Sequence, residues 1–229
     1  MYGKYIEGLV LLCCLTGTAV HAQKTFCFST GAGIAYVSKK ELNADYTPVL
    51  TANITATLMI PVSEKIFAEA GIGYRRKGFN SFSQVTNDDQ NDQYHGRARY
   101  DYIGIPLTIA GTIKQTRNGR LWIGGGMVYG FMLRGRTDIH HNSYIDGVLR
   151  GSYDYSFRPR IGLVQSRRKE IELFAFDTGL KLQAVYIYRK RWLLQLFHEH
   201  SLYSFVANAH DGSSLKQRYT GISIGIVVH

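Results

Sequence analysis

One stretch near the end of the chain, His198-Glu199-His200-Ser201, carries residue types that are used in ester hydrolysis. A serine hydroxyl becomes a nucleophile when a histidine within hydrogen-bond reach removes its proton. The stretch lies in a segment with the alternation of a β-strand, where neighbouring side chains point to opposite faces. His200 and Ser201 would therefore point away from each other, and Glu199 fills the position after His198. We predict no catalytic residues here.

The same histidines raise the question of a metal centre. His198 and His200, two positions apart on a strand, share a face and could share a metal ion. His210 follows beyond the strand, and His140 and His141 lie far away in the sequence. Spacing fixes no third ligand, and no glycine-rich phosphate loop, nucleophile elbow or zinc-binding helix motif is present. We therefore expect no metal site and no cofactor.

The beginning of the chain has the pattern of a secretory signal peptide. Residues 1–7 form a short polar start, and residues 8–15 are apolar but too few to span a bilayer as a helix. Val20 and Ala22 then occupy the −3 and −1 positions of a cleavage site before Gln23. We predict a signal peptide over residues 1–22 and one exported domain over residues 23–229.

The composition narrows the class of the exported domain. Of the three cysteines only Cys27 lies after residue 22, so an intramolecular disulfide is impossible. The chain holds 24 Gly, 16 Tyr and 11 Phe against 4 Pro, which favours strands, and it has no apolar run of about 18 residues that could form a membrane helix. Its net charge of +10 calls for an anionic partner. For an exported chain we expect lipid headgroups, lipopolysaccharide or acidic glycans, and no nucleic acid.

Apolar and polar residues alternate with a period of two along the whole exported part, as in residues 50–60. We predict eight strands, at residues 25–37, 49–61, 66–82, 98–113, 120–134, 170–188, 192–204 and 217–229. The connections between them are alternately long and short, with long ones at residues 38–48, 83–97, 135–169 and 207–216. Outer-membrane barrels have this arrangement, with tight periplasmic turns and long external loops.

The two faces of the strands indicate which side meets lipid. One face is mostly Gly, Ser and Thr with isolated charges, which suits a narrow lumen. The other is bulky and almost free of charge, which suits hydrocarbon. A soluble lipocalin-like carrier would place its apolar face inside instead. We predict an all-β fold: a closed antiparallel transmembrane β-barrel of eight strands, with short periplasmic turns and long extracellular loops.

Aromatic residues fall near the predicted strand ends, where membrane barrels carry girdles at the lipid–water interfaces. We expect the following residues in these girdles: Tyr36, Tyr74, Tyr100, Tyr102, Phe131, Tyr186, Tyr188 and Trp192.

Four short motifs, in this order, resemble the PorT-like family of outer-membrane β-barrel proteins. They are Gly-Ile-Gly-Tyr at 71–74, Arg-Lys-Gly at 76–78, Tyr-Ile-Gly-Ile-Pro-Leu at 102–107 and Phe-Asp-Thr-Gly-Leu at 176–180. The resemblance covers essentially all of the exported part. It implies an outer-membrane location and a barrel fold, and it implies no single shared activity.

Five charged residues fall on the lumen side of the predicted strands: Glu69, Arg75, Asp177, Lys181 and Glu199. Unpaired charges in a narrow lumen are costly, so we expect these side chains to pair. The interior of an eight-stranded barrel is only wide enough for side chains. We therefore expect an ion-paired plug, with Asp177 or Glu69 as the carboxylate beside Lys181, and we keep a narrow pore for small solutes as the alternative.

The segment 135–169 is the longest predicted external connection, and part of it should extend the neighbouring strands above the membrane. It combines tyrosines with basic residues, a mixture typical of binding surfaces. Its candidate surface-binding arginines are Arg136, Arg150, Arg158, Arg160, Arg167 and Arg168. The alternative is a solvated hairpin without a specific partner. A second basic group, at the short turns, faces the anionic inner leaflet.

These features together predict an integral outer-membrane protein that is not an enzyme. Its role would be anchoring, envelope assembly or secretion, or surface interaction through its extracellular loops, and its partners would be outer-membrane lipid, lipopolysaccharide, acidic glycan or other envelope proteins. A lipid-acting hydrolase is a further alternative. Some outer-membrane barrels deacylate lipid A with a histidine and a serine on one face of a late strand, a spacing that His200 and Ser201 lack.

Overall fold

The computed structural model describes residues 24–40, 44–162, 172–205 and 214–228, and the predicted signal peptide lies outside them. The strands are β1 (Thr25–Lys40), β2 (Asp45–Thr47), β3 (Val49–Pro61), β4 (Ile66–Asn87), β5 (Gln90–Gln115), β6 (Gly119–Ile145), β7 (Val148–Phe157), β8 (Arg160–Gly162), β9 (Glu172–Phe174), β10 (Phe176–Tyr188), β11 (Trp192–Ser201) and β12 (Ser214–Val228). In this part of the chain, no helix is long and apolar enough to cross a membrane.

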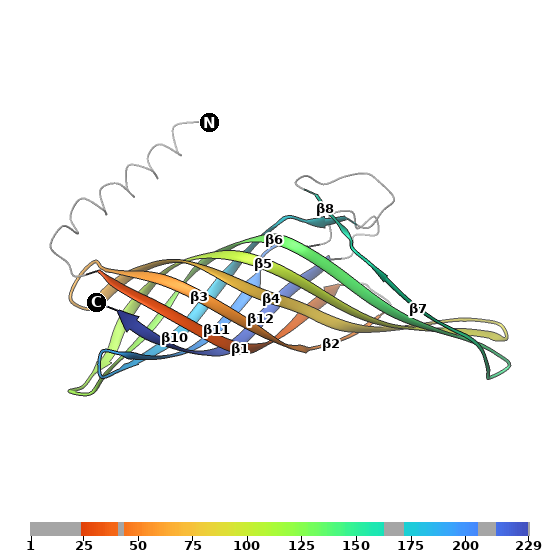
Figure 1. Cartoon of the computed structure of the whole chain (residues 1–229), viewed down its shortest axis with the longest axis horizontal. Coiled ribbons are helices and arrows are strands. Elements are labelled where there is room, and N and C mark those ends of the chain that lie inside the picture. The colour runs from red at the N-terminus through yellow and green to blue at the C-terminus, as the bar shows by residue number, and fades with distance from the viewer. Residues whose placement is uncertain (1–23, 41–43, 163–171, 206–213, 229) are drawn as a thin grey trace.

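Eight of these strands pair edge to edge into a closed ring (Figure 1). The order around the ring is β1-β3-β4-β5-β6-β10-β11-β12, and β12 pairs with β1 from Phe26↔Val228 onward. Every pairing in the ring is antiparallel. A closed ring leaves no unpaired edge in the hydrocarbon, where water cannot satisfy backbone groups. The predicted eight-stranded closed barrel is confirmed.

The outer surface of the barrel is apolar. Ile54, Leu182 and Ile224 each expose more than 60% of their surface on the outside. Their neighbours Thr55, Lys181 and Ser223 in the same strands are buried inside. The alternation therefore has the phase that was predicted for a membrane barrel, and it is the reverse of the phase of a soluble carrier.

The two ends of the barrel differ in the length of their connections. At one end, residues 62–65, 116–118 and 189–191 form short turns. At the other end, β4 and β5 remain paired as far as Asn87↔Gln90. The prediction of an external loop at residues 83–97 was wrong, because this segment is a regular hairpin. Both of its faces meet water above the membrane, so its residues lack the apolar alternation that marks the lipid-facing strands.

The segment 135–169 also continues the barrel wall, as was predicted for part of it. β6 runs to Ile145, turns at Asp146-Gly147 and returns as β7, which pairs with β6 up to Thr137↔Phe157. A tilted strand needs about 9–11 residues to cross a membrane, whereas β4, β5 and β6 have 22, 26 and 27. The surplus forms a four-stranded sheet of β4, β5, β6 and β7 that projects beyond the barrel (Figure 1). We call it the external sheet.

Several predicted boundaries need correction. The sixth ring strand begins at Phe176 rather than at residue 170, and the seventh ends at Ser201 rather than at 204. The short β9 pairs in parallel with β8 in a separate two-stranded sheet.

The structure places some of the predicted girdle residues on the outer surface of the barrel and others inside it. Five of its members are exposed on the outer surface: Tyr74, Phe131, Tyr186, Tyr188 and Trp192. Tyr100 and Tyr102 lie inside the barrel instead, with 3% and 1% of their surface exposed. They share the inward phase of Gly104 and Thr108 on β5, and phase, not distance from the strand end, decides the face.

Apolar side chains form three clusters inside the barrel. A cluster at the short-turn end includes Met59, Phe67 and Trp122. A second cluster, toward the external sheet, includes Phe79, Tyr102 and Phe205. A smaller third cluster consists of Ala35, Phe197 and Tyr219. Polar side chains occupy the space between these clusters.

Candidate functional site

The buried charges of the lumen form a balanced set. The structure places all five predicted charges inside the barrel and adds Lys77, on the same face of β4 as Arg75. Three cations (Arg75, Lys77 and Lys181) thus accompany three carboxylates (Glu69, Asp177 and Glu199) among the described buried residues. Lys77 was missed by the sequence analysis, although its position two residues after Arg75 marks it as inward-facing.

Two ion pairs cross the lumen. Arg75 Nη1 donates to Glu199 Oε2 at 2.9 Å, and Lys77 Nζ donates to Asp177 Oδ2 at 2.7 Å. The Lys77 ammonium also lies 5.3 Å from the centre of the Tyr102 ring. Asp177, one of the two carboxylates expected beside Lys181, is thus paired with Lys77. Each pair joins β4 to a strand far away in the sequence, which fills the lumen and ties opposite walls together.

Lys181 occupies a different environment from the one expected. It lies opposite Glu199 in the pairing of β10 with β11, and its ammonium is 5.9 Å from the Phe197 ring centre. Lys181 forms no ion pair with any described residue, so the expected pairing with Asp177 or Glu69 is not seen; those two carboxylates are bound by Lys77 and by Gln183 instead.

Glu69 is held by a chain of hydrogen bonds. Gln183 Nε2 donates to Glu69 Oε2 at 2.5 Å, and the Thr108 hydroxyl donates to the same oxygen at 3.2 Å. Gln195 Nε2 in turn donates to Gln183 Oε1 at 2.6 Å. A buried polar group that has its partners is far less costly than an orphaned one. The arrangement therefore has the features of a structural plug.

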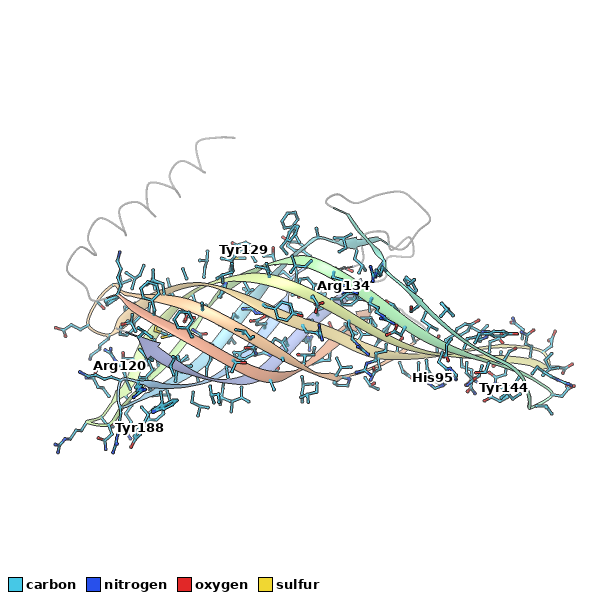
Figure 2. The ribbon with its side chains drawn as sticks, viewed as in Figure 1. His95, Arg120, Tyr129, Arg134, Tyr144 and Tyr188 are labelled. Atoms are coloured by element: carbon cyan, nitrogen blue, oxygen red, sulfur yellow. The ribbon has the colours of Figure 1, made fainter. Side chains whose placement is uncertain are left out.

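The outward face of β4, β5 and β6, just beyond the membrane-facing residues, carries a dense group of arginines. Three successive rungs of the sheet read Arg76–Asp101–Arg134, Gly78–Arg99–Arg136 and Asn80–Arg97–Asp138. We call Arg76, Arg97, Arg99, Arg134 and Arg136 the arginine patch; all five are exposed. Figure 2 shows Arg134 where the sheet leaves the barrel.

Part of the arginine patch is neutralised by carboxylates. Arg76 Nε donates to Asp101 Oδ1 at 2.8 Å, and Arg136 Nε donates to Asp138 Oδ1 at 2.7 Å. The remaining three arginines, Arg97, Arg99 and Arg134, form no ion pair with any described residue. Five cations against two carboxylates leave an excess charge of three. The rung on the membrane side, Tyr74–Ile103–Phe131, is apolar and aromatic, so the charge begins where the lipid-facing band ends.

The predicted binding arginines of segment 135–169 do not form one cluster. Arg136 belongs to the arginine patch, Arg150 is exposed on β7, and Arg158 is exposed just after β7. Arg160 begins β8, and Arg167 and Arg168 lie outside the described residues. The other patch members were not predicted as binding residues, because in the sequence they fall in predicted strands or in a different loop. Pairing β4 with β5 and β6 in register would have brought them together.

Histidines and tyrosines occupy both faces of the external sheet, near His95 and Tyr144 in Figure 2. On the inner face, Tyr94 stacks on His141 with ring centres 4.4 Å apart. His141 Nε2 contacts Asp92 Oδ1 at 3.2 Å. Hydrogen bonds from Ser143 and His141 lower the pKa of the Asp92 carboxyl. On the outer face, His140 Nδ1 contacts Asp154 Oδ1 at 2.7 Å.

The histidines and serine of β11 point in different directions. Ser201 is buried inside the barrel, whereas His198 lies on the outer face with its Nδ1 2.7 Å from the Thr220 hydroxyl. His200 lies on the outer face as well, and His210 is outside the described residues. Within the described part of the chain, no three His, Cys, Asp or Glu side chains are placed to share a metal ion.

Comparison with known proteins places the chain in a family. Residues 21–206 match the family model described as "Outer membrane protein beta-barrel domain". A comparison with curated proteins finds no match.

The solved structures to which the chain is similar include the following three proteins. For the attachment invasion locus protein Ail of Yersinia pestis, identity is 11%, coverage is 90% of this chain and 99% of that one, and the TM-score is 0.37. For Neisserial surface protein A, identity is 9%, coverage is 88% of this chain and 96% of that one, and the TM-score is 0.40. For the outer membrane protein OprG of Pseudomonas aeruginosa, identity is 14%, coverage is 92% of this chain and 99% of that one, and the TM-score is 0.43.

The family model covers most of the chain, and the closed ring with its apolar outer surface has the geometry that a membrane barrel requires. The chain belongs to the outer membrane protein beta-barrel domain family and is an integral protein of the outer membrane.

Proposed function

We propose that this protein is a non-enzymatic, non-conducting outer-membrane anchor that binds an anionic surface partner through the arginine patch. Its export depends on the signal peptide at residues 1–22, and the order of its sequence motifs supports placing it with the PorT-like proteins. The partner class is phosphate- or sulfate-bearing glycan, with lipopolysaccharide of the outer leaflet as its nearest source. The observation that carries the proposal is the set of three rungs that present five arginines outward.

Arginine is suited to this partner class because its planar guanidinium donates two parallel hydrogen bonds to phosphate or sulfate oxygens. Neighbouring strands lie about 4.8 Å apart, so adjacent arginines such as Arg99 and Arg136 can contact one anionic group together. Two cations side by side repel each other unless an anion lies between them. The patch is therefore built for an occupant that the chain itself does not supply.

The height of the patch favours a partner at the membrane surface. Tyr74 donates from its hydroxyl to Asp101 Oδ1 at 2.6 Å, which joins the aromatic rung to the first rung of the patch. Tyrosines are enriched at headgroup level. The headgroups of the outer leaflet are thus the first anionic groups that the arginines meet.

Binding can be measured with barrels in lipid nanodiscs, using lipopolysaccharide and sucrose octasulfate as probes. The latter is a heparin analogue that is bound in a structure of the Yersinia pestis protein Ail. The combined change Arg97→Gln, Arg99→Gln and Arg134→Gln should weaken binding by at least tenfold, since each charge-assisted bond contributes roughly 1.5–3 kcal/mol. The control Arg191→Gln, at the short-turn end, should leave binding unchanged.

Salt provides a second readout. Charges at an exposed site are screened within about 8 Å at physiological ionic strength, so binding should weaken as salt rises. A parallel variant, in which Gln replaces Arg158, Arg160, Arg167 and Arg168, tests whether the other arginines of segment 135–169 contribute to binding. If the patch variant binds normally, or if binding ignores salt, the patch is a solvated surface and the proposal is wrong.

The closed lumen is tested by conductance. Ion pairs cross the lumen and apolar clusters lie toward both of its ends, which supports a lumen that does not conduct. Planar bilayers containing the purified protein should therefore show no steady channel current. A large and stable current would favour the narrow pore instead.

A further inference from the structure

The lipid-facing wall of the barrel contains a groove of about 650 Å³ near the short turns. Its outward-facing lining consists of two neighbouring rungs that run across β3, β1, β12, β11 and β10. The rung nearer the short turns ends in Trp192 and Tyr188, and the other rung ends in Leu194 and Tyr186. Figure 2 shows Tyr188 at this end of the barrel, far from the external sheet. The groove therefore lies at the level of the inner leaflet.

Small side chains interrupt the bulky apolar surface at this groove. Thr30 lies between Ile54 and Ile224 in one rung, and Ala56 lies beside Phe28 in the other. Among the described residues that line the groove, none carries a charge. Pockets for drug-sized ligands usually measure about 300–1,000 Å³, so a groove of this size has room for one acyl chain.

Two arginines lie at the end of the groove that is nearest the periplasm. The guanidinium carbon of Arg189 is 5.2 Å from the centre of the Tyr188 ring, and that of Arg191 is 5.7 Å from the centre of the Trp192 ring. Both rings line the groove. A guanidinium is attracted to the face of an aromatic ring, so these contacts hold two positive charges beside an apolar groove.

The turn that carries these arginines has unusual residue types. Arg189 and Lys190 have positive φ angles of 48° and 60°, whereas two-residue turns of this kind prefer Asn-Gly or Asp-Gly. The cations are therefore present at a conformational cost, which supports a role beyond chain reversal. The short turns and the strand ends beside them, residues 62–65, 114–120 and 189–191, hold seven cations and one carboxylate. This end of the barrel thus favours anionic groups.

We propose that the groove binds phosphatidylglycerol of the inner leaflet, with one acyl chain along the apolar rungs and the phosphate held by Arg189 and Arg191. A guanidinium donates two parallel hydrogen bonds to phosphate oxygens. A zwitterionic lipid fits less well, because neither residues 189–191 nor the described lining of the groove contains an Asp or Glu that could hold an ammonium group. The site is at the opposite end of the barrel from the arginine patch and is independent of the proposed function.

Trp192 makes the site measurable, because it lines the groove and exposes 55% of its surface. The variant Trp122→Phe removes the buried tryptophan and leaves Trp192 as the sole reporter. Vesicles of phosphatidylcholine receive a small fraction of phosphatidylglycerol with brominated acyl chains, since bromine quenches tryptophan fluorescence on contact. The quenching gives the affinity for phosphatidylglycerol relative to phosphatidylcholine. We expect a preference of at least about fivefold, because each Lys or Arg near an anionic lipid contributes roughly that factor.

Recognition of the headgroup is tested by removing charge at two places. The double variant Arg189→Gln with Arg191→Gln should abolish the preference. The matched control is Lys114→Gln with Arg117→Gln, which removes the same charge at the short turn between β5 and β6, across the ring from β12 and β1. This control should keep the preference. Heat-modifiable migration on gels shows that each variant is folded.

The contribution of the groove is tested without changing charge. Ala56→Phe fills the groove and should also abolish the preference, because a lipid kept out of the groove cannot place its phosphate at both arginines. The matched control is Ala70→Phe on β4, between Leu58 and Leu107 on the same outer surface but outside the groove. This variant should keep the preference.

Several outcomes would overturn the proposal. Equal quenching by brominated phosphatidylglycerol and brominated phosphatidylcholine would show that the groove does not select an anionic lipid, and the unmodified protein can give this result without any variant. Equal quenching by brominated phosphatidylethanolamine would show that net charge is not recognised. A preference that survives the double arginine variant would place the headgroup elsewhere. A preference that survives Ala56→Phe would mean that surface charge alone enriches the lipid.

Discussion

The ion pair between Lys77 and Asp177 provides the sharpest test of the plugged lumen. Both side chains are more than nine-tenths buried, and their charged atoms are 2.7 Å apart. With an effective dielectric constant of about 20, two unit charges at this distance attract by roughly 6 kcal/mol. Desolvation opposes this attraction, so the intact pair need not contribute much net stability. Removing one partner is different, because the other charge stays buried without compensation.

The change Lys77→Met should therefore lower the free energy of unfolding by roughly 3–5 kcal/mol. Arg75 also acts on Asp177, which places the expected loss toward the lower end. The double variant Lys77→Met with Asp177→Leu should recover most of the loss, since apolar replacement of a whole buried pair is often neutral or stabilising. The exposed control Arg150→Met should change stability by less than about 0.5 kcal/mol.

Urea unfolding in lipid vesicles, followed by tryptophan fluorescence and by heat-modifiable migration, measures these differences. A neutral or stabilising Lys77→Met would refute the argument, because it would mean that Asp177 is hydrated or protonated rather than compensated by Lys77. A double variant as unstable as the single one would show that the loss comes from packing around Tyr102 instead of from charge.

Three other changes test the remaining assignments. Ile54→Arg, on the outer face, should cost about 2–4 kcal/mol near the midplane, whereas Thr55→Ser should cost little; equal costs would contradict the lipid-facing phase. Lys181→Met should lower the thermal midpoint, because it removes one of the three buried cations that balance three buried carboxylates in the lumen, and an unchanged midpoint would contradict this charge balance. The pKa of Asp92 is lowered from its ordinary value of 3.8, so its carboxylate stabilises the external sheet above that pH, and the contribution is lost as pH falls through the lower folded-state pKa. Protection factors for hydrogen exchange in the external sheet should therefore fall on acidification below about pH 4, and Asp92→Asn should abolish that fall.

The barrel was predictable from sequence because the membrane imposes a strict pattern on it. Ile54 and Leu182 must meet hydrocarbon while Thr55 and Lys181 must not, so polarity switches at every residue in the spanning strands. The external sheet has no such constraint, since both of its faces meet water. In this sheet the sequence feature that indicates a hairpin is the dipeptide Asp146-Gly147, which is typical of two-residue hairpin turns. Gly147 has a φ angle of 74° in that turn, so this dipeptide, rather than hydrophobicity, marks the hairpin.

The candidate sites were harder to predict from the sequence than the barrel, because they depend on the register between strands. Strand phase alone places Lys77 and Asp177 inside the lumen, but only the ring order brings β4 opposite β10 across it. In the same way, Arg99 and Arg136 lie more than thirty residues apart in sequence and become neighbours only when β5 pairs with β6. A one-residue slip in that pairing would move a strand's side chains to the opposite face. Register therefore determines both which charges compensate each other inside the barrel and which remain available outside it.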